Sequence, residues 1–168
     1  MSMKHPQPAA MDIRPARIED AGAVAALLGQ LGYVRTGAAV RRCIRASASD
    51  PESAILVAAW PDGRLVGCLQ AVVTRRLAEG DRGEIASLVV NADQRGRGIG
   101  AHLVRAAVEW LQARGIADLR VRCDVARARA HRFYERGGFG RTKTQAVFDR
   151  PLSPGRALPT TEQDPTAR

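Results

Sequence analysis

Apolar residues form two kinds of pattern along the first half of the chain: a helical spacing and continuous runs. A helical spacing predicts a helix within residues 18–32, "IEDAGAVAALLGQLG". Its apolar positions are Val24, Leu27, Leu28 and Leu31. Thr36 is suited to cap a second helix over residues 37–48, which the following "SDP" would end. The continuous apolar runs "AILVAAW" and "RLVGCLQAVV", joined by the turn "PDG", instead predict a β-hairpin.

The second half continues this alternation. "GEIASLVV" predicts a strand antiparallel to the hairpin, and a long helix follows over residues 98–114, with Gly115 as its terminator. "ADLRVRC" predicts a strand parallel to the previous one, because a helix separates the two. "RARAHRFYERGGF" predicts another helix, and residues 140–150 a last hairpin. With the short strand "MDIRPA" near the start, the order β-α-α-β-β-β-α-β-α-β-β predicts a mixed α/β fold with helices on both faces of the sheet.

Length and composition indicate one ordinary globular domain. The chain has 168 residues, of which 45% are hydrophobic and 26% charged. We expect a single domain over residues 11–150, a disordered N-terminus over 1–10 and a disordered, proline-rich tail over 151–168. The N-terminus lacks the apolar segment of a secretory signal, and "AILVAAW" is too short to cross a bilayer. These features predict a cytoplasmic protein with no membrane partner.

Charge and cysteine content limit the kinds of partner and metal site that we expect. Basic residues outnumber acidic ones by 26 to 17, a net charge of +9. All but Lys4 and Lys143 are arginines, which is more typical of genome composition than of nucleic-acid binding. Aromatic residues make up only 4% of the chain and offer no stacking platform, so we expect no nucleic-acid partner. Three widely spaced cysteines predict reduced thiols, with neither a disulfide framework nor a metal site.

The loop at residues 95–100 carries the clearest chemical signal. "RGRGIG" places three glycines between a predicted strand and a predicted helix. Glycine allows a ligand to approach the backbone, and a helix N-terminus offers unpaired N–H groups and the positive end of its dipole. This combination binds phosphate. The spacing is not G-x-G-x-x-G, as in dinucleotide-binding proteins, and there is no G-K-[ST], as in P-loops. A plain helix entrance seldom needs three glycines.

A third pattern fits the loop and its surroundings. Arg95-x-x-Gly98-x-Gly100 resembles the [QR]-x-x-G-x-[GA] signature of the GNAT superfamily of acetyl-CoA-dependent N-acetyltransferases. The preceding Ile85-x-x-Leu88-x-Val90 is similar to that family's strand. "ARARAHRFYERGGF", residues 126–139, resembles its second motif. The resemblance follows the element order over residues 11–150 and is specific from Ile85 to Phe139.

The resemblance implies a fold, a co-substrate and a binding site. The sheet would be mostly antiparallel, with a central splayed parallel pair of strands opened by a bulge. Pantetheine would bond to the backbone of Leu88 and Val90 in the gap, where an N–H group also polarises the thioester carbonyl. The pyrophosphate of acetyl-CoA would lie on the loop, and Arg127 could contact a phosphate. The expected coenzyme-binding residues are Leu88, Val89, Val90, Arg95, Gly96, Arg97, Gly98, Ile99, Gly100 and Arg127.

The resemblance also implies catalytic roles. Tyr134 would be the general acid that protonates the leaving thiolate, although a tyrosine in a helix is more commonly a packing residue. Many relatives have Glu where this chain has Ala86, which removes a frequent candidate for the general base. Glu84 is then the nearest carboxylate, with Asp124 as a second candidate. His131 we interpret as structural.

Two functions therefore remain after sequence analysis. The first is an enzyme that transfers acetyl from acetyl-CoA to a primary amine of a small molecule or peptide, with no metal. The second is a catalytically silent coenzyme A-binding sensor or interaction module of the same fold, which the missing Glu favours and Tyr134 opposes. A homodimer would be common for the family. The identity of the amine does not follow from the sequence.

Overall fold

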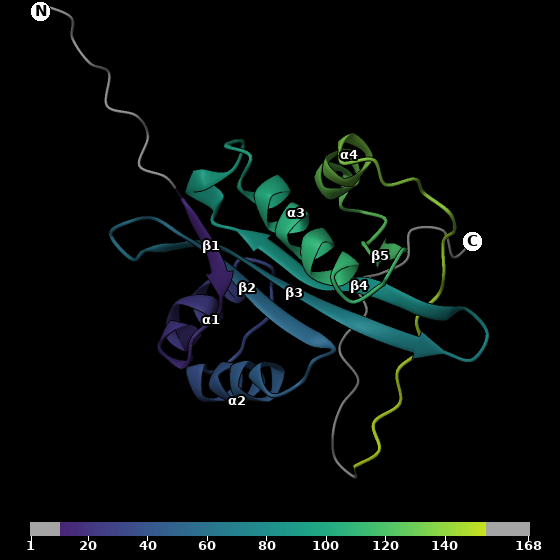
Figure 1. The fold of residues 1–168 in the computed structure, drawn as a ribbon, viewed down its shortest axis with the longest axis horizontal. Helices are drawn as coiled ribbons and strands as arrows, with labels where there is room; N and C mark the ends of the chain where they lie inside the picture. Colours follow the sequence, from purple (N-terminus) through teal and green to yellow (C-terminus); the bar gives the residue numbers. More distant parts are fainter. Residues whose placement is uncertain (1–10, 154–168) are drawn as a thin grey trace, which may run out of the picture. The chain divides into compact units, whose positions relative to one another are not determined.

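The computed structural model describes residues 11–153, which divide between Cys123 and Asp124 into two compact units. The first unit contains one five-stranded sheet in the order β1-β2-β3-β4-β5 (Figure 1). Its strands are β1 (Asp12–Pro15), β2 (Ser53–Ala59), β3 (Leu65–Arg76), β4 (Gly80–Val90) and β5 (Leu119–Val121). Neighbouring strands are antiparallel except β4 and β5, which are parallel. The predicted mixed, mostly antiparallel sheet is thus confirmed.

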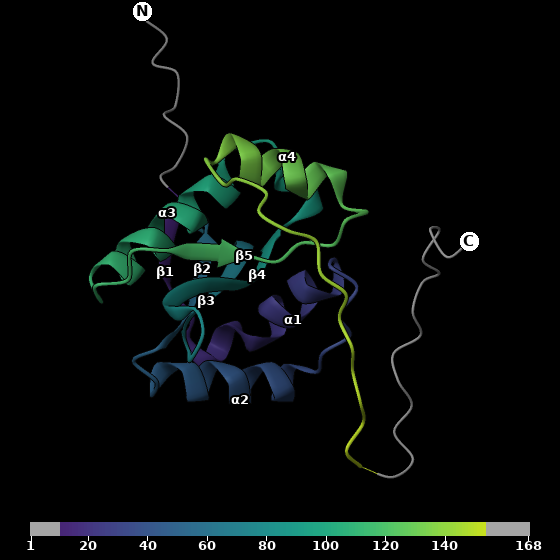
Figure 2. The same ribbon diagram turned by 90° about the vertical axis from the view of Figure 1, so that its right-hand side faces the viewer.

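Helices cover both faces of this sheet. The first unit contains α1 (Ala21–Gly29), α2 (Gly37–Ala48) and α3 (Ile99–Gln112), with short 3₁₀ turns η1 (Ile18–Asp20) and η2 (Ala92–Gln94). Figures 1 and 2 show α1 and α2 on one side of the sheet and α3 on the other. The Thr36 hydroxyl caps α2 as predicted, accepting a hydrogen bond from the Ala39 N–H at 3.2 Å.

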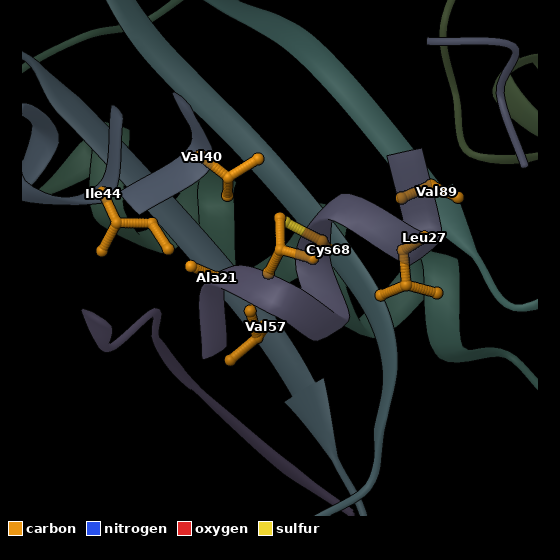
Figure 3. Packing of buried hydrophobic residues seen from close by; sticks show 8 residues of the cluster. Ala21, Leu27, Val40, Ile44, Val57, Cys68 and Val89 are labelled. Atoms are coloured by element: carbon orange, nitrogen blue, oxygen red, sulfur yellow. The ribbon is translucent and has the colours of Figure 1, made fainter. Parts of the chain in front are cut away.

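The face covered by α1 and α2 holds one hydrophobic cluster. Its buried residues come from both helices and from three strands (Figure 3): Ala21, Val24, Leu27, Val40, Ile44, Val57, Cys68 and Val89. Val57 and Cys68 lie directly opposite each other in the β2–β3 register, so they share this face. Burial also raises the pKa of the Cys68 thiol to about 12, so this cysteine acts as an uncharged core residue.

The opposite face packs tightly against α3. One side of α3 is buried and consists of Ile99, Leu103, Ala107 and Leu111. Two strand glycines make room for it, because a Cβ at Gly83 would lie 2.5 Å from Leu111 and one at Gly67 would lie 2.9 Å from Leu103. The absence of side chains at these two positions lets α3 lie close to β3 and β4. This packing fixes the position of α3, which follows the glycine loop.

A bulge interrupts β4 at Ala86. In the β3–β4 register Ala71 pairs with Ile85 and Gln70 pairs with Ser87, so Ala86 has no opposite residue. The strand alternation shifts by one residue at this point. Ile85 and Leu88 therefore share the α3 face, whereas Glu84 and Ser87 share the other face. The bulge expected from the family resemblance is present, within the strand that precedes the loop.

The second unit contains α4 (Ala128–Arg136), and Gly138 follows it with a φ of 85°. The predicted hairpin over residues 140–150 is wrong, because the structure has no strand there and every one of these side chains is exposed. The segment "GRTKTQAVFDR" has only three consecutive apolar residues and no tight turn between two strand-like runs. It therefore lacks the sequence pattern that is typical of a β-hairpin. Within the described residues, β5 is the last strand of the sheet. The expected N-terminal disorder and most of the predicted tail lie outside residues 11–153.

Candidate functional site

The loop between β4 and α3 adopts a conformation that needs glycine. Gly96 and Gly98 have φ angles of 80° and 77°, in the left-handed region where a side chain costs about 1–2 kcal/mol. Gly98 forms the N-cap of α3, so no side chain caps the first N–H groups of the helix. A helix over residues 98–114 was predicted, and the observed α3 begins one residue later because Gly98 itself makes the turn.

This turn leaves a set of backbone donors at the start of α3. The first N–H group with an acceptor is that of His102, which donates to the Gly98 carbonyl at 3.1 Å. In the described part of the chain, no hydrogen bond uses the N–H groups from Gly96 to Ala101. Ile99 contributes only its backbone, because its side chain is buried. These donors and the positive end of the helix dipole suit an anion such as a pyrophosphate.

Three hydrogen bonds hold the loop in place. The Asn91 N–H donates to the Val66 carbonyl at 2.9 Å, which keeps the end of β4 on β3. The Arg95 Nε donates back to the Val90 carbonyl at 3.2 Å, so the Arg95 side chain closes the loop at its base. The side-chain carbonyl of Gln30, just after α1, accepts from the Ala92 N–H at 2.9 Å. The sequence offered no signal for the Gln30 contact, which joins residues 62 positions apart.

Strands β4 and β5 separate before they reach the loop. Their pairing ends at Ile85 and Val121, although β4 continues to Val90. Backbone N–H groups alternate direction along a strand, and that of Asn91 points at β3. The Leu88 and Val90 N–H groups therefore face the other side, beyond the end of the β4–β5 pairing. This is the geometry that an added extended ligand requires.

Glu84 lies in an ion-pair cluster on the other face of β4. Its side chain is 15% exposed and pairs with Arg76 at 3.5 Å and with Arg122. Because of the bulge at Ala86, Glu84 does not share a face with Leu88, as it would in a regular strand. Both of its carboxylate oxygens thus contact guanidinium groups.

The remaining candidate residues belong to the second unit. The Tyr134 ring makes edge-to-face contacts with Phe133 and Phe139, at centroid distances of 5.1 and 5.4 Å. Arg127 is the N-cap of α4. His131 donates from Nε2 to the Asp124 carbonyl at 2.8 Å, which agrees with the structural role expected for it.

A cavity of about 370 Å³ borders the glycine loop in the first unit. The loop contributes Gln94 and Arg97, and the β2–β3 turn contributes the other lining residues: Trp60, Pro61, Asp62 and Arg64. The sequence pattern predicts a turn at "PDG" but gives no sign that this turn lies beside the loop. The antiparallel order of β2, β3 and β4 brings them to the same end of the sheet, since Gly67 near the start of β3 pairs with Val90 at the end of β4.

Within residues 11–153, no group of three or more His, Cys, Asp or Glu side chains is arranged to hold a metal ion. No helix in the described residues has the length and apolar character needed to span a bilayer.

The chain is similar in structure to several solved proteins. A glucosamine-6-phosphate N-acetyltransferase from Arabidopsis thaliana is 23% identical, with 83% of this chain and 98% of that chain covered at a TM-score of 0.72. A transcriptional regulator from Bacillus halodurans C-125 is 26% identical, with coverages of 84% and 100% and a TM-score of 0.74. An aminoglycoside N-acetyltransferase in complex with CoA is 19% identical, with coverages of 89% and 100% and a TM-score of 0.77.

Sequence comparison agrees with the structural similarity. No curated protein matches the chain. The family model described as "Acetyltransferase (GNAT) family" matches residues 25–139, which include the β4 strand, the glycine loop and α4. The chain therefore belongs to the GNAT family of acetyltransferases.

Proposed function

We propose that this protein transfers an acetyl group from acetyl-CoA to a primary amine by direct attack of the amine on the thioester. The amine belongs to a small molecule or peptide. Solved relatives named for acetylating glucosamine-6-phosphate and aminoglycosides support an amine acceptor. The family match crosses the boundary between the two units, which supports residues 11–150 as one functional domain.

One observation carries this proposal: the separation of β4 from β5 leads directly into the glycine loop. Pantetheine would bond to the N–H groups of Leu88 and Val90 as an added strand, and the pyrophosphate would accept from the N–H groups of the loop. The bulge at Ala86 and the left-handed Gly98 support this arrangement, because they shape the end of β4 and the entrance of α3. A donor beside the thioester carbonyl would stabilise the oxyanion that forms during attack.

Proton transfer completes the reaction. The attacking amine loses a proton, the carbon–sulfur bond breaks as the new carbon–nitrogen bond forms, and the departing sulfur gains a proton. Tyr134 is our proposed donor to the sulfur, because a phenol keeps its proton at neutral pH. Glu84 is our proposed acceptor of the amine proton. It would act directly or through one water molecule, from a carboxylate that also pairs with Arg76 and Arg122.

We expect Glu84→Gln to lower the rate most at low pH, where the amine is mainly protonated and needs a base. The measurement is the pH–rate profile under saturating acetyl-CoA. Glu79→Gln is a matched control, because Glu79 pairs with Arg76 and Arg120 in the same cluster. If both variants change the profile equally, the effect is electrostatic. A Glu84→Gln profile identical to that of the wild type would exclude Glu84 and favour Asp124, another carboxylate or solvent.

We expect Gln30→Ala to weaken acetyl-CoA binding by about 2- to 10-fold, because it removes one hydrogen bond that fixes the loop. Calorimetric titration with acetyl-CoA measures this change. Gln112→Ala at the end of α3 is the control, since that exposed glutamine lies at the opposite end of the helix from the loop. Unchanged affinity in Gln30→Ala would show that the other contacts alone hold the loop.

A second candidate function is a coenzyme A-binding module without turnover. Ala86 favours it, because the bulge carries no carboxylate at the position where many relatives have Glu. One structurally similar protein is named a transcriptional regulator. Thiol release from acetyl-CoA with a panel of amines distinguishes the two functions. Turnover with any amine supports the enzyme, whereas tight coenzyme binding without thiol release across the panel supports the module.

A further inference from the structure

Two backbone hydrogen bonds close the β2–β3 turn that lines one side of the cavity. In the turn, the Trp60 N–H donates to the Arg64 carbonyl at 2.9 Å and the Gly63 N–H donates to the Trp60 carbonyl at 2.8 Å. Gly63 has a φ of 85°, which permits this tight connection. The side chains of Trp60 and Arg64 are therefore presented from a fixed backbone.

Asp62 pairs with the Arg64 guanidinium on this turn, where the two side chains are 52% and 73% exposed. One carboxylate oxygen accepts from the Arg64 N–H at 3.0 Å and the other from Arg64 Nε at 2.7 Å. Hydrogen bonding from the Arg64 backbone and then from its side chain lowers the pKa of Asp62, so the carboxylate remains ionised at neutral pH. In residues 11–153, the two terminal nitrogens of Arg64 make no hydrogen bond.

Arg97 supplies a second guanidinium from the opposite wall. It lies in the glycine loop between the two left-handed glycines, and no hydrogen bond or ion pair engages its side chain within the described residues. The lining thus has two guanidinium groups and one carboxylate, and that carboxylate is already used by Arg64. Planar guanidinium groups bind phosphate in a bidentate manner, and an indole ring offers a face on which a base can stack.

We propose that this cavity binds the ribose 3′-phosphate of acetyl-CoA, with the adenine base against the Trp60 ring. The inference rests on the proposed function. In coenzyme A, the 3′-phosphate and the pyrophosphate are attached to the same ribose, so one sugar ring separates them. A pyrophosphate on the loop N–H groups would therefore leave the 3′-phosphate within reach of Arg97, which lies in the same loop. The cavity has a volume of about 370 Å³ and is widely open to solvent, so a ligand bound there would stay partly exposed.

Titration of the full chain with coenzyme A and with dephospho-coenzyme A tests this assignment, because the two differ only in the 3′-phosphate. We expect the wild type to prefer coenzyme A by about tenfold or more, as for a lost charge-assisted hydrogen bond. Arg64→Gln should reduce this preference to about threefold or less and leave dephospho-coenzyme A binding unchanged. Arg41→Gln, on the exposed face of α2, removes the same charge and should keep the wild-type preference.

A fluorescence measurement tests the position of the base. The chain has two tryptophans, so Trp110→Phe leaves Trp60 as the reporter. Adenosine 3′,5′-bisphosphate should quench the Trp60 fluorescence. Arg64→Gln should lower the affinity obtained from this titration.

Each remaining outcome overturns the assignment. An equal affinity of the wild type for the two coenzymes excludes a 3′-phosphate site. A preference that Arg127→Gln abolishes and Arg64→Gln retains moves the phosphate to the start of α4. If inorganic phosphate binds with the same dependence on Arg64 while both coenzymes bind equally, the cavity holds a different phosphate ligand. In all three cases acetyl-CoA still binds and the proposed function stands, whereas a wild type that binds no coenzyme at all removes the proposed function as well.

Discussion

Replacing Tyr134 by Phe should lower turnover ~10²–10⁴-fold while leaving acetyl-CoA affinity intact. The factor is that of a lost general acid and corresponds to roughly 3–5 kcal/mol of transition-state stabilisation. Phenylalanine keeps the ring, so the edge-to-face contacts with Phe133 and Phe139 remain. A lost neutral hydrogen bond would cost only about 0.5–1.5 kcal/mol, so the size of the effect identifies its origin.

The measurement is thiol release under saturating acetyl-CoA, with coenzyme affinity and melting temperature determined in parallel. Tyr33→Phe is the matched control, because Tyr33 is the other tyrosine of the chain and is 59% exposed. A fall of less than about threefold in Tyr134→Phe, with binding intact, would make Tyr134 a packing residue and assign the proton to water or another group. If Tyr134→Phe is unfolded, its hydroxyl has a structural role instead.

Replacing Gly98 by Val should weaken acetyl-CoA binding by about 100-fold or more. Gly98 has a φ of 77°, and valine would force the entrance of α3 into another conformation. The N–H groups that follow would then no longer converge on the pyrophosphate, and each charge-assisted hydrogen bond contributes about 1.5–3 kcal/mol. A Cβ at Gly98 would lie 3.9 Å from His102, so the expected loss comes from backbone conformation and contact with the ligand.

The structure provides a control at the other end of the same helix. Gly115 has a φ of 74°, and a Cβ there would meet no atom within 4 Å. Gly115→Val therefore carries a similar backbone strain far from the loop and should lower the melting temperature without changing coenzyme affinity. Equal coenzyme affinity in folded Gly98→Val and in the wild type would contradict the phosphate assignment.

Local sequence signals predicted most of the secondary structure. These signals extend over only a few residues, so they can be recognised without knowledge of the fold. They include the cap at Thr36, the apolar stripe of α3 and the apolar runs of β2 and β3. The same holds for the glycine loop, because the left-handed backbone at Gly96 and Gly98 requires glycine at those positions themselves. Residues 140–150 were the exception, because their three consecutive apolar residues are too weak a local pattern to define two paired strands.

The sequence by itself determined the order of elements from β1 to α4, the glycine-rich loop before α3 and the resemblance to the family. Tertiary structure decided which groups surround that loop. The bulge at Ala86 arises from pairing with β3 and turns Glu84 away from the face of Leu88. The contact between Gln30 and Ala92, and the cavity between Arg64 and Arg97, join residues from separate elements. Such contacts depend on strand register and helix packing, which are set by the whole core and not by short-range residue patterns.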